Sequence, residues 1–154
     1  MTAIFPGSFD PFTRGHEAIV RRALTIFDKI IIGVGVNTDK TGFMTPENRV
    51  CLIEDVFAKE SRITVKLYNS LTIDFARDMQ ATHIIRGLRN TTDMQYEQNL
   101  ETLGRRLAPN IETIYIMTET AYVDISSSAI RELYRFGTCV KELMPRGVKL
   151  DNYL

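Results

Sequence analysis

Short apolar segments alternate with segments of helical periodicity along this chain of 154 residues, and this alternation limits its fold more than any other feature. No internal repeat, low-complexity stretch or Pro/Gly-rich linker interrupts the pattern. The apolar segments that read as strands cover residues 2–5, 30–36, 63–67, 82–85 and 112–117. Because each crossover between parallel strands lays its helix back on the sheet with one hand, this order predicts a parallel sheet.

We therefore expect an α/β fold with a Rossmann-like, doubly wound, five-stranded parallel sheet, helices on both faces and a helical C-terminus. A single domain over residues 1–154 is expected. The second helix has the clearest start, since Thr45 can cap it and Pro46 occupies its first position. Its expected inward face carries Val50, Ile53, Val56 and Phe57. A later helix, from Asp93, places Tyr96, Leu100, Leu103 and Leu107 on one stripe.

Charge and composition exclude several classes of function. Nineteen basic residues balance nineteen acidic ones, so no overall field attracts nucleic acid or an anionic membrane. No apolar run is long enough to predict a membrane span. Cys51 and Cys139 lack a paired Cys/His spacing, and the N-terminus shows no basic-then-apolar leader. We expect a globular, soluble, cytoplasmic protein that binds neither nucleic acid nor membrane.

Polar residues follow the strands at the ends where parallel sheets bind ligands. After the first strand, the motif Thr-Arg-Gly-His at residues 13–16 places His16 at the start of a helix. Exposed N–H groups and the helix dipole favour a phosphate there, and Gly15 permits its close approach. A histidine at this position also begins ordinary surface helices, so this motif alone does not decide between the two interpretations.

Three cations are expected at the same edge of the sheet. Lys40 follows the second strand, and Arg86 and Arg89 flank Gly87 in an expected loop after the fourth. Taken singly, such residues commonly lie on a solvated rim. Together they offer the charge neutralisation that two phosphate-bearing reactants require before they can react.

A serine cluster at residues 126–128 precedes the last major helix. Such a cluster can serve only as an N-cap, or it can form a second phosphate-binding site from hydroxyls and free N–H groups. The sequence contains no Gly-x-Ser-x-Gly elbow, no Walker motif and no Gly-x-Gly-x-x-Gly after the first strand. These absences count against a serine hydrolase, a P-loop kinase and a dinucleotide dehydrogenase.

Taken together, the motifs resemble those of the bacterial phosphopantetheine adenylyltransferases, within the nucleotidyltransferase superfamily. The superfamily part is Pro-Gly-Ser-Phe-Asp-Pro at residues 6–11, Thr-x-Gly-His at 13–16 and Ile-Ser-Ser-Ser at 125–128. Arg-Gly-Leu-Arg at residues 86–89, followed by Asp93, Tyr96 and Glu97, is the family-specific part. The resemblance extends from Ile4 to about Pro145.

The resemblance implies that the phosphate of 4′-phosphopantetheine attacks the α-phosphorus of ATP directly, giving dephospho-coenzyme A and pyrophosphate in the penultimate step of coenzyme A biosynthesis. By similarity, His16 stabilises the transition state, with Lys40 and Arg89 as further catalytic residues. Mg²⁺ is implied as a cofactor held mainly by substrate phosphates, so no metal-binding residue of the protein is expected. A homohexamer and feedback inhibition by coenzyme A are also implied.

The resemblance also assigns the binding residues. Those implied for the acceptor are Ser8, Lys40, Thr72 and Arg86, of which Thr72 matches a position that touches the pantetheine arm. Those implied for ATP are Ser8, Phe9, His16, Gly87, Leu88, Arg89, Glu97, Tyr122, Val123, Asp124, Ile125, Ser126, Ser127 and Ser128. The chain departs from the family pattern at Ser8, where many relatives have Thr, and at Gly104, where relatives often carry an Asn that reaches the pantetheine.

Three other interpretations remain open from the sequence. A related nucleotidyltransferase would act on nicotinamide mononucleotide, or on glycerol 3-phosphate with CTP, and the superfamily motifs do not distinguish it. A nucleotide sensor would bind ATP without turnover, although it would have no need for transition-state stabilisation. An interaction module would use the exposed helices, but the sequence gives no positive sign of one.

Overall fold

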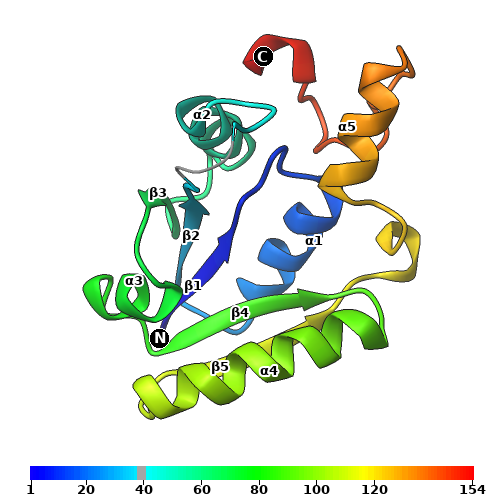
Figure 1. Ribbon diagram of the computed structural model, residues 1–154. Coiled ribbons are helices and arrows are strands. Elements are labelled where there is room, and N and C mark those ends of the chain that lie inside the picture. Colours follow the sequence, from blue (N-terminus) through cyan, green and yellow to red (C-terminus); the bar gives the residue numbers. More distant parts are fainter. Residues whose placement is uncertain (38–40) are drawn as a thin grey trace.

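The computed structural model describes residues 1–37 and 41–154 and contains a five-stranded, all-parallel sheet (Figure 1). The strands are β1 (Thr2–Gly7), β2 (Lys29–Gly35), β3 (Ile63–Tyr68), β4 (His83–Leu88) and β5 (Glu112–Met117). Their order in the sheet is β3-β2-β1-β4-β5. The chain therefore builds outward from β1 in both directions, and the fold class expected from the sequence is confirmed.

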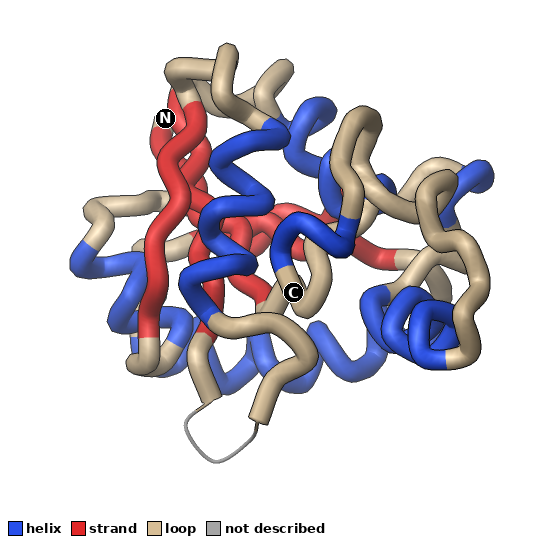
Figure 2. Tube along the Cα trace, turned by 90° about the horizontal axis from the view of Figure 1, so that it is seen from above, coloured by secondary structure: helices blue, strands red, loops and turns tan. Residues whose placement is uncertain are grey.

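The helices are α1 (Arg14–Ala23), α2 (Pro46–Val56), α3 (Thr72–Asp78), α4 (Thr91–Leu107) and α5 (Ser127–Arg135). Two short 3₁₀ helices cover Thr120–Tyr122 and Leu150–Tyr153. The strands lie centrally with helices around them (Figure 2). No described helix is long and apolar enough to cross a membrane.

The two faces of the sheet bury separate apolar clusters because successive side chains of a strand point to opposite sides. Phe5 and Ile32 lie in the larger cluster with side chains of α1 and α2. Ile4 and Ile31, their immediate neighbours in sequence, lie in the smaller cluster with Phe75 of α3. Helices thus cover both faces, as expected from the sequence, and the continuous apolar run of β2 suits a strand that is buried on both sides.

The fourth strand is longer than the sequence suggested. Arg86, Gly87 and Leu88 were expected in a loop, but they continue β4 and pair with Tyr115 to Met117 of β5. Gly87 suits this position because a Cβ there would collide with the side chain of Ile19, where α1 crosses the strand. The strand therefore carries Arg86 and Leu88 as far as the edge of the site.

Helix α2 begins at Pro46 with Thr45 as its cap, as predicted. Its expected inward residues do face the core, since Ile53 and Phe57 are buried and Val50 and Val56 are partly buried against the same cluster. Arg49, Leu52 and Ile53 are its buried residues, and Leu52 is completely buried. The sequence pattern missed Leu52 and Arg49. Arg49 is charged, and apolar periodicity alone would assign it to solvent.

Helix α4 has the expected apolar stripe, but none of its 17 residues is buried within the described part of the chain. Tyr96, Leu103 and Leu107 are each more than half exposed. Gly104 lies inside this helix, where a Cβ would approach Ile73 of α3 to 3.4 Å. This is an ordinary van der Waals separation, so the packing of α4 beside α3 does not require a glycine here.

Candidate active site

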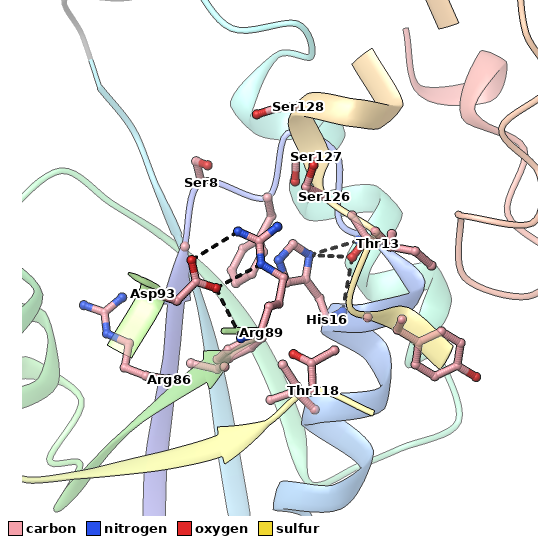
Figure 3. A pocket seen from close by; sticks show the side chains of 18 of the residues that line it. Ser8, Thr13, His16, Arg86, Arg89, Asp93, Thr118, Ser126, Ser127 and Ser128 are labelled. Atoms are coloured by element: carbon pink, nitrogen blue, oxygen red, sulfur yellow. Dashed lines mark hydrogen bonds and ion pairs between the residues drawn. The ribbon is translucent and has the colours of Figure 1, made fainter. Parts of the chain in front are cut away.

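A cavity of about 350 Å³ opens at the carboxyl ends of β1 and β4. This is the point at which the strand order reverses, and ligands bind there in doubly wound sheets. Figure 3 shows side chains from the β1 loop, α1, β4, α4 and α5 converging on it. The lining includes these residues assigned by resemblance: Ser8, Phe9, His16, Arg86, Gly87, Arg89, Glu97, Tyr122, Ile125, Ser126, Ser127 and Ser128.

The remaining residues assigned by resemblance do not line this cavity. Leu88 is buried in β4, and Val123 and Asp124 are exposed in the segment before α5. Thr72 lines a second cavity of about 310 Å³ between α3 and α4. Lys40 lies outside the described residues.

The two cavities share the side chains of Arg86 and Glu97. They are therefore adjacent, and the second is lined mainly by apolar side chains of α3, α4 and β5. The pair thus combines a cavity that contains two arginines with a more apolar extension.

His16 is held in one orientation by Thr13, the cap of α1. The Thr13 hydroxyl oxygen accepts a hydrogen bond from the His16 backbone N–H at 3.2 Å. In return, the Thr13 backbone N–H donates to Nδ1 of His16 at 3.1 Å. Nδ1 is thus an acceptor in the neutral ring, which places the proton on Nε2.

The surroundings of the His16 ring favour its neutral form. The ring packs against Phe5, Phe9 and Phe12, with centroids 5.1 Å apart in the case of Phe9. Burial, and to a smaller extent the positive charge of Arg89, lower the pKa of His16 from 6.5 to about 4. At neutral pH, His16 is therefore a hydrogen-bond donor without a charge of its own.

We expect a ¹⁵N–¹H NMR titration of the folded protein to show His16 neutral, with its proton on Nε2, down to about pH 5. The reason is its folded-state pKa of about 4. In denaturant the same ring should titrate near pH 6.5. The unfolded state then binds a proton that the folded state lacks, so this group lowers the folding stability as the pH falls from 6.5 towards 4. A folded-state inflection near 6.5, or a proton on Nδ1, would contradict the assignment.

Both arginines of the cavity are paired with carboxylates from α4. Arg89 Nε lies 3.0 Å from Oδ2 of Asp93, and Arg86 Nε lies 3.1 Å from Oε2 of Glu97. The resemblance assigned Glu97 to the nucleotide site. Glu97 lines the cavity and is paired there with Arg86.

The three serines before α5 have different partners. The Ser126 side chain caps the helix by accepting from the Ala129 N–H at 3.0 Å. The Ser127 hydroxyl donates to the Pro11 carbonyl at 2.8 Å, and the Ser128 hydroxyl accepts from Arg131 at 3.2 Å. The capping interpretation is thus right for Ser126. The helix N-terminus as a whole still faces the cavity, where it favours an anion.

Sequence reasoning missed a buried ion pair behind the site. The Asp10 carboxylate accepts from the backbone N–H groups of Phe43 and Met44, both at 2.8 Å. Arg49 Nε lies 3.3 Å from Asp10, and Arg49 donates to the carbonyl oxygens of Met44 at 2.8 Å and Ser8 at 3.3 Å. The pair joins the β1 loop to the segment before α2. No spacing rule pairs an Asp in one loop with an Arg in a later helix.

Comparison with known proteins agrees with this geometry. The sequence matches the cytidylyltransferase-like family over residues 4–133. It is 47% identical over 149 residues to the phosphopantetheine adenylyltransferase of Phocaeicola vulgatus, covering 97% of this chain and 98% of that protein. The identity to the phosphopantetheine adenylyltransferase of Levilactobacillus brevis is 45% over 143 residues, covering 93% and 89%.

A solved structure shows the same fold. A bifunctional NMN adenylyltransferase/ADP ribose pyrophosphatase from Francisella tularensis superposes with a TM-score of 0.74 at 17% identity, covering 96% of this chain and 45% of that one. At this identity the similarity shows the fold alone. The family match and the near full-length relatives go further: this chain belongs to the cytidylyltransferase-like family and, within it, to the phosphopantetheine adenylyltransferases.

Proposed function

We propose that this chain transfers the adenylyl group of ATP to the phosphate of 4′-phosphopantetheine and releases dephospho-coenzyme A and pyrophosphate. The observation that carries the proposal is the convergence of His16, Arg86 and Arg89 on one cavity at the ends of β1 and β4. The acceptor follows from the names of the relatives and suits the adjacent apolar cavity. The single domain over residues 1–154 remains part of the proposal.

The reaction is a direct displacement at the α-phosphorus of ATP. An oxygen of the acceptor phosphate forms the new bond, and the bond from the α-phosphorus to the bridging oxygen of pyrophosphate breaks. A phosphate monoester is already an anionic nucleophile at neutral pH, so the enzyme does not need a strong base. Catalysis then rests on alignment and charge stabilisation.

His16 is proposed to act on the transition state. With Nδ1 held by Thr13, the Nε2–H is free to donate to a non-bridging oxygen of the α-phosphate. The charge on that oxygen grows as the phosphorus becomes pentacovalent, so the hydrogen bond is stronger in the transition state than in the ground state.

The acceptor phosphate is assigned to Ser8 and Arg86, together with Lys40, which the resemblance implies. Ser8 follows the carboxyl end of β1, and Arg86 lies at the junction of the two cavities. Thr72 of α3 lines the second cavity, where the pantetheine arm is placed. Gly104 also lines this cavity and offers no side chain to the arm.

We expect Arg86→Ala to raise the KM for 4′-phosphopantetheine by roughly tenfold or more, because a charge-assisted contact to phosphate is lost. The affinity for ATP should stay within about threefold. Steady-state kinetics with each substrate varied in turn, and calorimetry with ATP alone, measure the two effects. Arg77→Ala, which removes an exposed arginine of α3, serves as the control. An unchanged KM for the acceptor would remove Arg86 from this role.

The nucleotide is assigned to Arg89, the backbone at Gly87 and Leu88, and the segment from Tyr122 to Ser128. The N-terminus of α5 faces the same cavity and favours the phosphates of ATP.

The described residues contain no group of three or more potential metal ligands, and Asp93 and Glu97 are each paired with an arginine. This donor set suits a Mg²⁺ ion that enters with ATP and is held by phosphate oxygens. When bound, Mg²⁺ would neutralise charge on the leaving pyrophosphate.

The oligomeric state, feedback inhibition and cellular location expected for this chain are also part of the proposal. The oligomer is a homohexamer, which the resemblance implies. Coenzyme A contains both the pantetheine and the adenylyl parts, so feedback inhibition at this site is proposed. Both cysteines are free, which suits the reducing cytoplasm expected from the sequence.

Product stoichiometry tests the proposed function. Purified protein with ATP, Mg²⁺ and 4′-phosphopantetheine is expected to form dephospho-coenzyme A and pyrophosphate in equal amounts, measured by mass spectrometry and a pyrophosphate assay. Without an acceptor, pyrophosphate should not form. Release of pyrophosphate and AMP without dephospho-coenzyme A would reject transfer in favour of hydrolysis. ATP binding without turnover would favour the sensor.

A further inference from the structure

We propose that Asp93 is a positioning residue for ATP, which holds Arg89 by one edge of its guanidinium and so directs the other end at the nucleotide phosphates. This inference rests on the proposed nucleotide site and adds a residue to which the resemblance gave no role. It concerns the first turn of α4, directly after the carboxyl end of β4.

The contacts between Asp93 and Arg89 are directional. Oδ2 of Asp93 accepts from Nε of Arg89 at 3.0 Å and from its backbone N–H at 3.2 Å, and Oδ1 lies 3.4 Å from Nη2. The carboxylate thus binds both the guanidinium and the backbone of the same residue. No hydrogen bond from Nη1 is present within residues 1–37 and 41–154. The edge of the guanidinium formed by Nε and Nη2 is therefore fixed, and Nη1 remains available to bind an anion.

Asp93 is itself held in place. Its backbone N–H donates to the Asn90 side chain at 2.9 Å, in the cap of α4. Both Asp93 and Arg89 line the main cavity. In Figure 3 the Arg89 guanidinium lies between the Asp93 carboxylate and the His16 ring. Arg89 is also close enough to His16 for its charge to act on the imidazole.

The next turn of α4 repeats the arrangement. Glu97 lies four residues after Asp93 and contacts Nε of Arg86 at 3.1 Å, so one helix face presents two carboxylates to two cavity arginines. An arginine side chain that is free to rotate loses rotamer entropy when it is fixed. A carboxylate that fixes the guanidinium beforehand reduces that loss when ATP binds.

A double-mutant cycle on ATP binding tests the proposal. Calorimetry with ATP and Mg²⁺, without acceptor, compares the wild type, Asp93→Asn, Arg89→Ala and the double variant. We expect Asp93→Asn to weaken ATP binding roughly tenfold in the wild-type background and less than about twofold when Arg89 is already Ala. The asparagine keeps the size and one acceptor oxygen. Glu60→Gln is the matched control, since Glu60 holds an exposed Arg62 by the same Nε and Nη2 edge outside the site.

The outcomes separate positioning from a purely structural role. An equal loss of ATP affinity in both backgrounds would assign Asp93 to the structure of α4 and overturn the proposal. Unchanged or tighter ATP binding by Asp93→Asn would also overturn the proposal. The carboxylate would then contribute nothing to ATP binding, or it would compete with ATP for Arg89. The cycle needs no acceptor, so a failure of the proposed transfer reaction is recognised separately, by absent turnover of the wild type.

Discussion

Replacement of His16 by alanine is expected to lower kcat by about 10²-fold or more, with ATP affinity within a few fold of the wild type. The neutral Nε2–H would contribute mainly when charge develops on the α-phosphate. Its loss therefore raises the free energy of the transition state more than that of bound ATP. Steady-state kinetics with 4′-phosphopantetheine give kcat, and calorimetry gives the dissociation constant of ATP.

The control for this variant is His83→Ala, since His83 begins β4 at the opposite end from the cavity. Circular dichroism and the melting temperature should accompany the kinetics, because the imidazole of His16 also bonds the Thr13 backbone N–H. A His16→Ala protein that folds normally and keeps the wild-type kcat would exclude the transition-state role.

Replacement of Arg49 by alanine is expected to destabilise the protein by about 3–5 kcal/mol, because a buried Asp10 carboxylate loses its charged partner. For a chain of this length the Tm should fall by roughly 10 °C. The Met44 and Ser8 carbonyl oxygens lose their donors at the same time. Chemical and thermal denaturation of both proteins measure the change.

Arg77→Ala provides the comparison, since it removes a pair that is about half exposed on both sides. Exposed ion pairs contribute little, so its cost should stay below about 1 kcal/mol. Arg49→Lys keeps the positive charge but lacks the planar guanidinium with its several donors, and we expect an intermediate loss of folding stability. Equal stabilities of Arg49→Ala and the wild type would show that the buried pair is energetically neutral.

The sequence predicted those features that depend on local pattern. The apolar runs gave the five strands and their parallel arrangement, and Thr45 with Pro46 gave the start of α2. His16 was correctly expected at the beginning of a helix at the sheet edge. These features follow from periodicity and capping, which act between residues close in the sequence.

Features that depend on contacts between distant segments were not predictable in this way. The extension of β4 through Arg86 and Gly87 comes from pairing with β5, about thirty residues later. The Asp10 and Arg49 pair is formed by two segments whose approach only the folded sheet defines. The pairing of Glu97 with Arg86 likewise depends on how α4 packs beside β4.

The most direct test of the central claim compares acceptors with the purified protein. Pyrophosphate release from ATP and Mg²⁺ is measured with 4′-phosphopantetheine, with nicotinamide mononucleotide and with pantetheine that lacks the phosphate. The account predicts turnover with 4′-phosphopantetheine only, since the acceptor phosphate is the nucleophile and its arm occupies the cavity beside α4. Turnover with nicotinamide mononucleotide instead, or with none of the three acceptors despite measurable ATP binding, would contradict it.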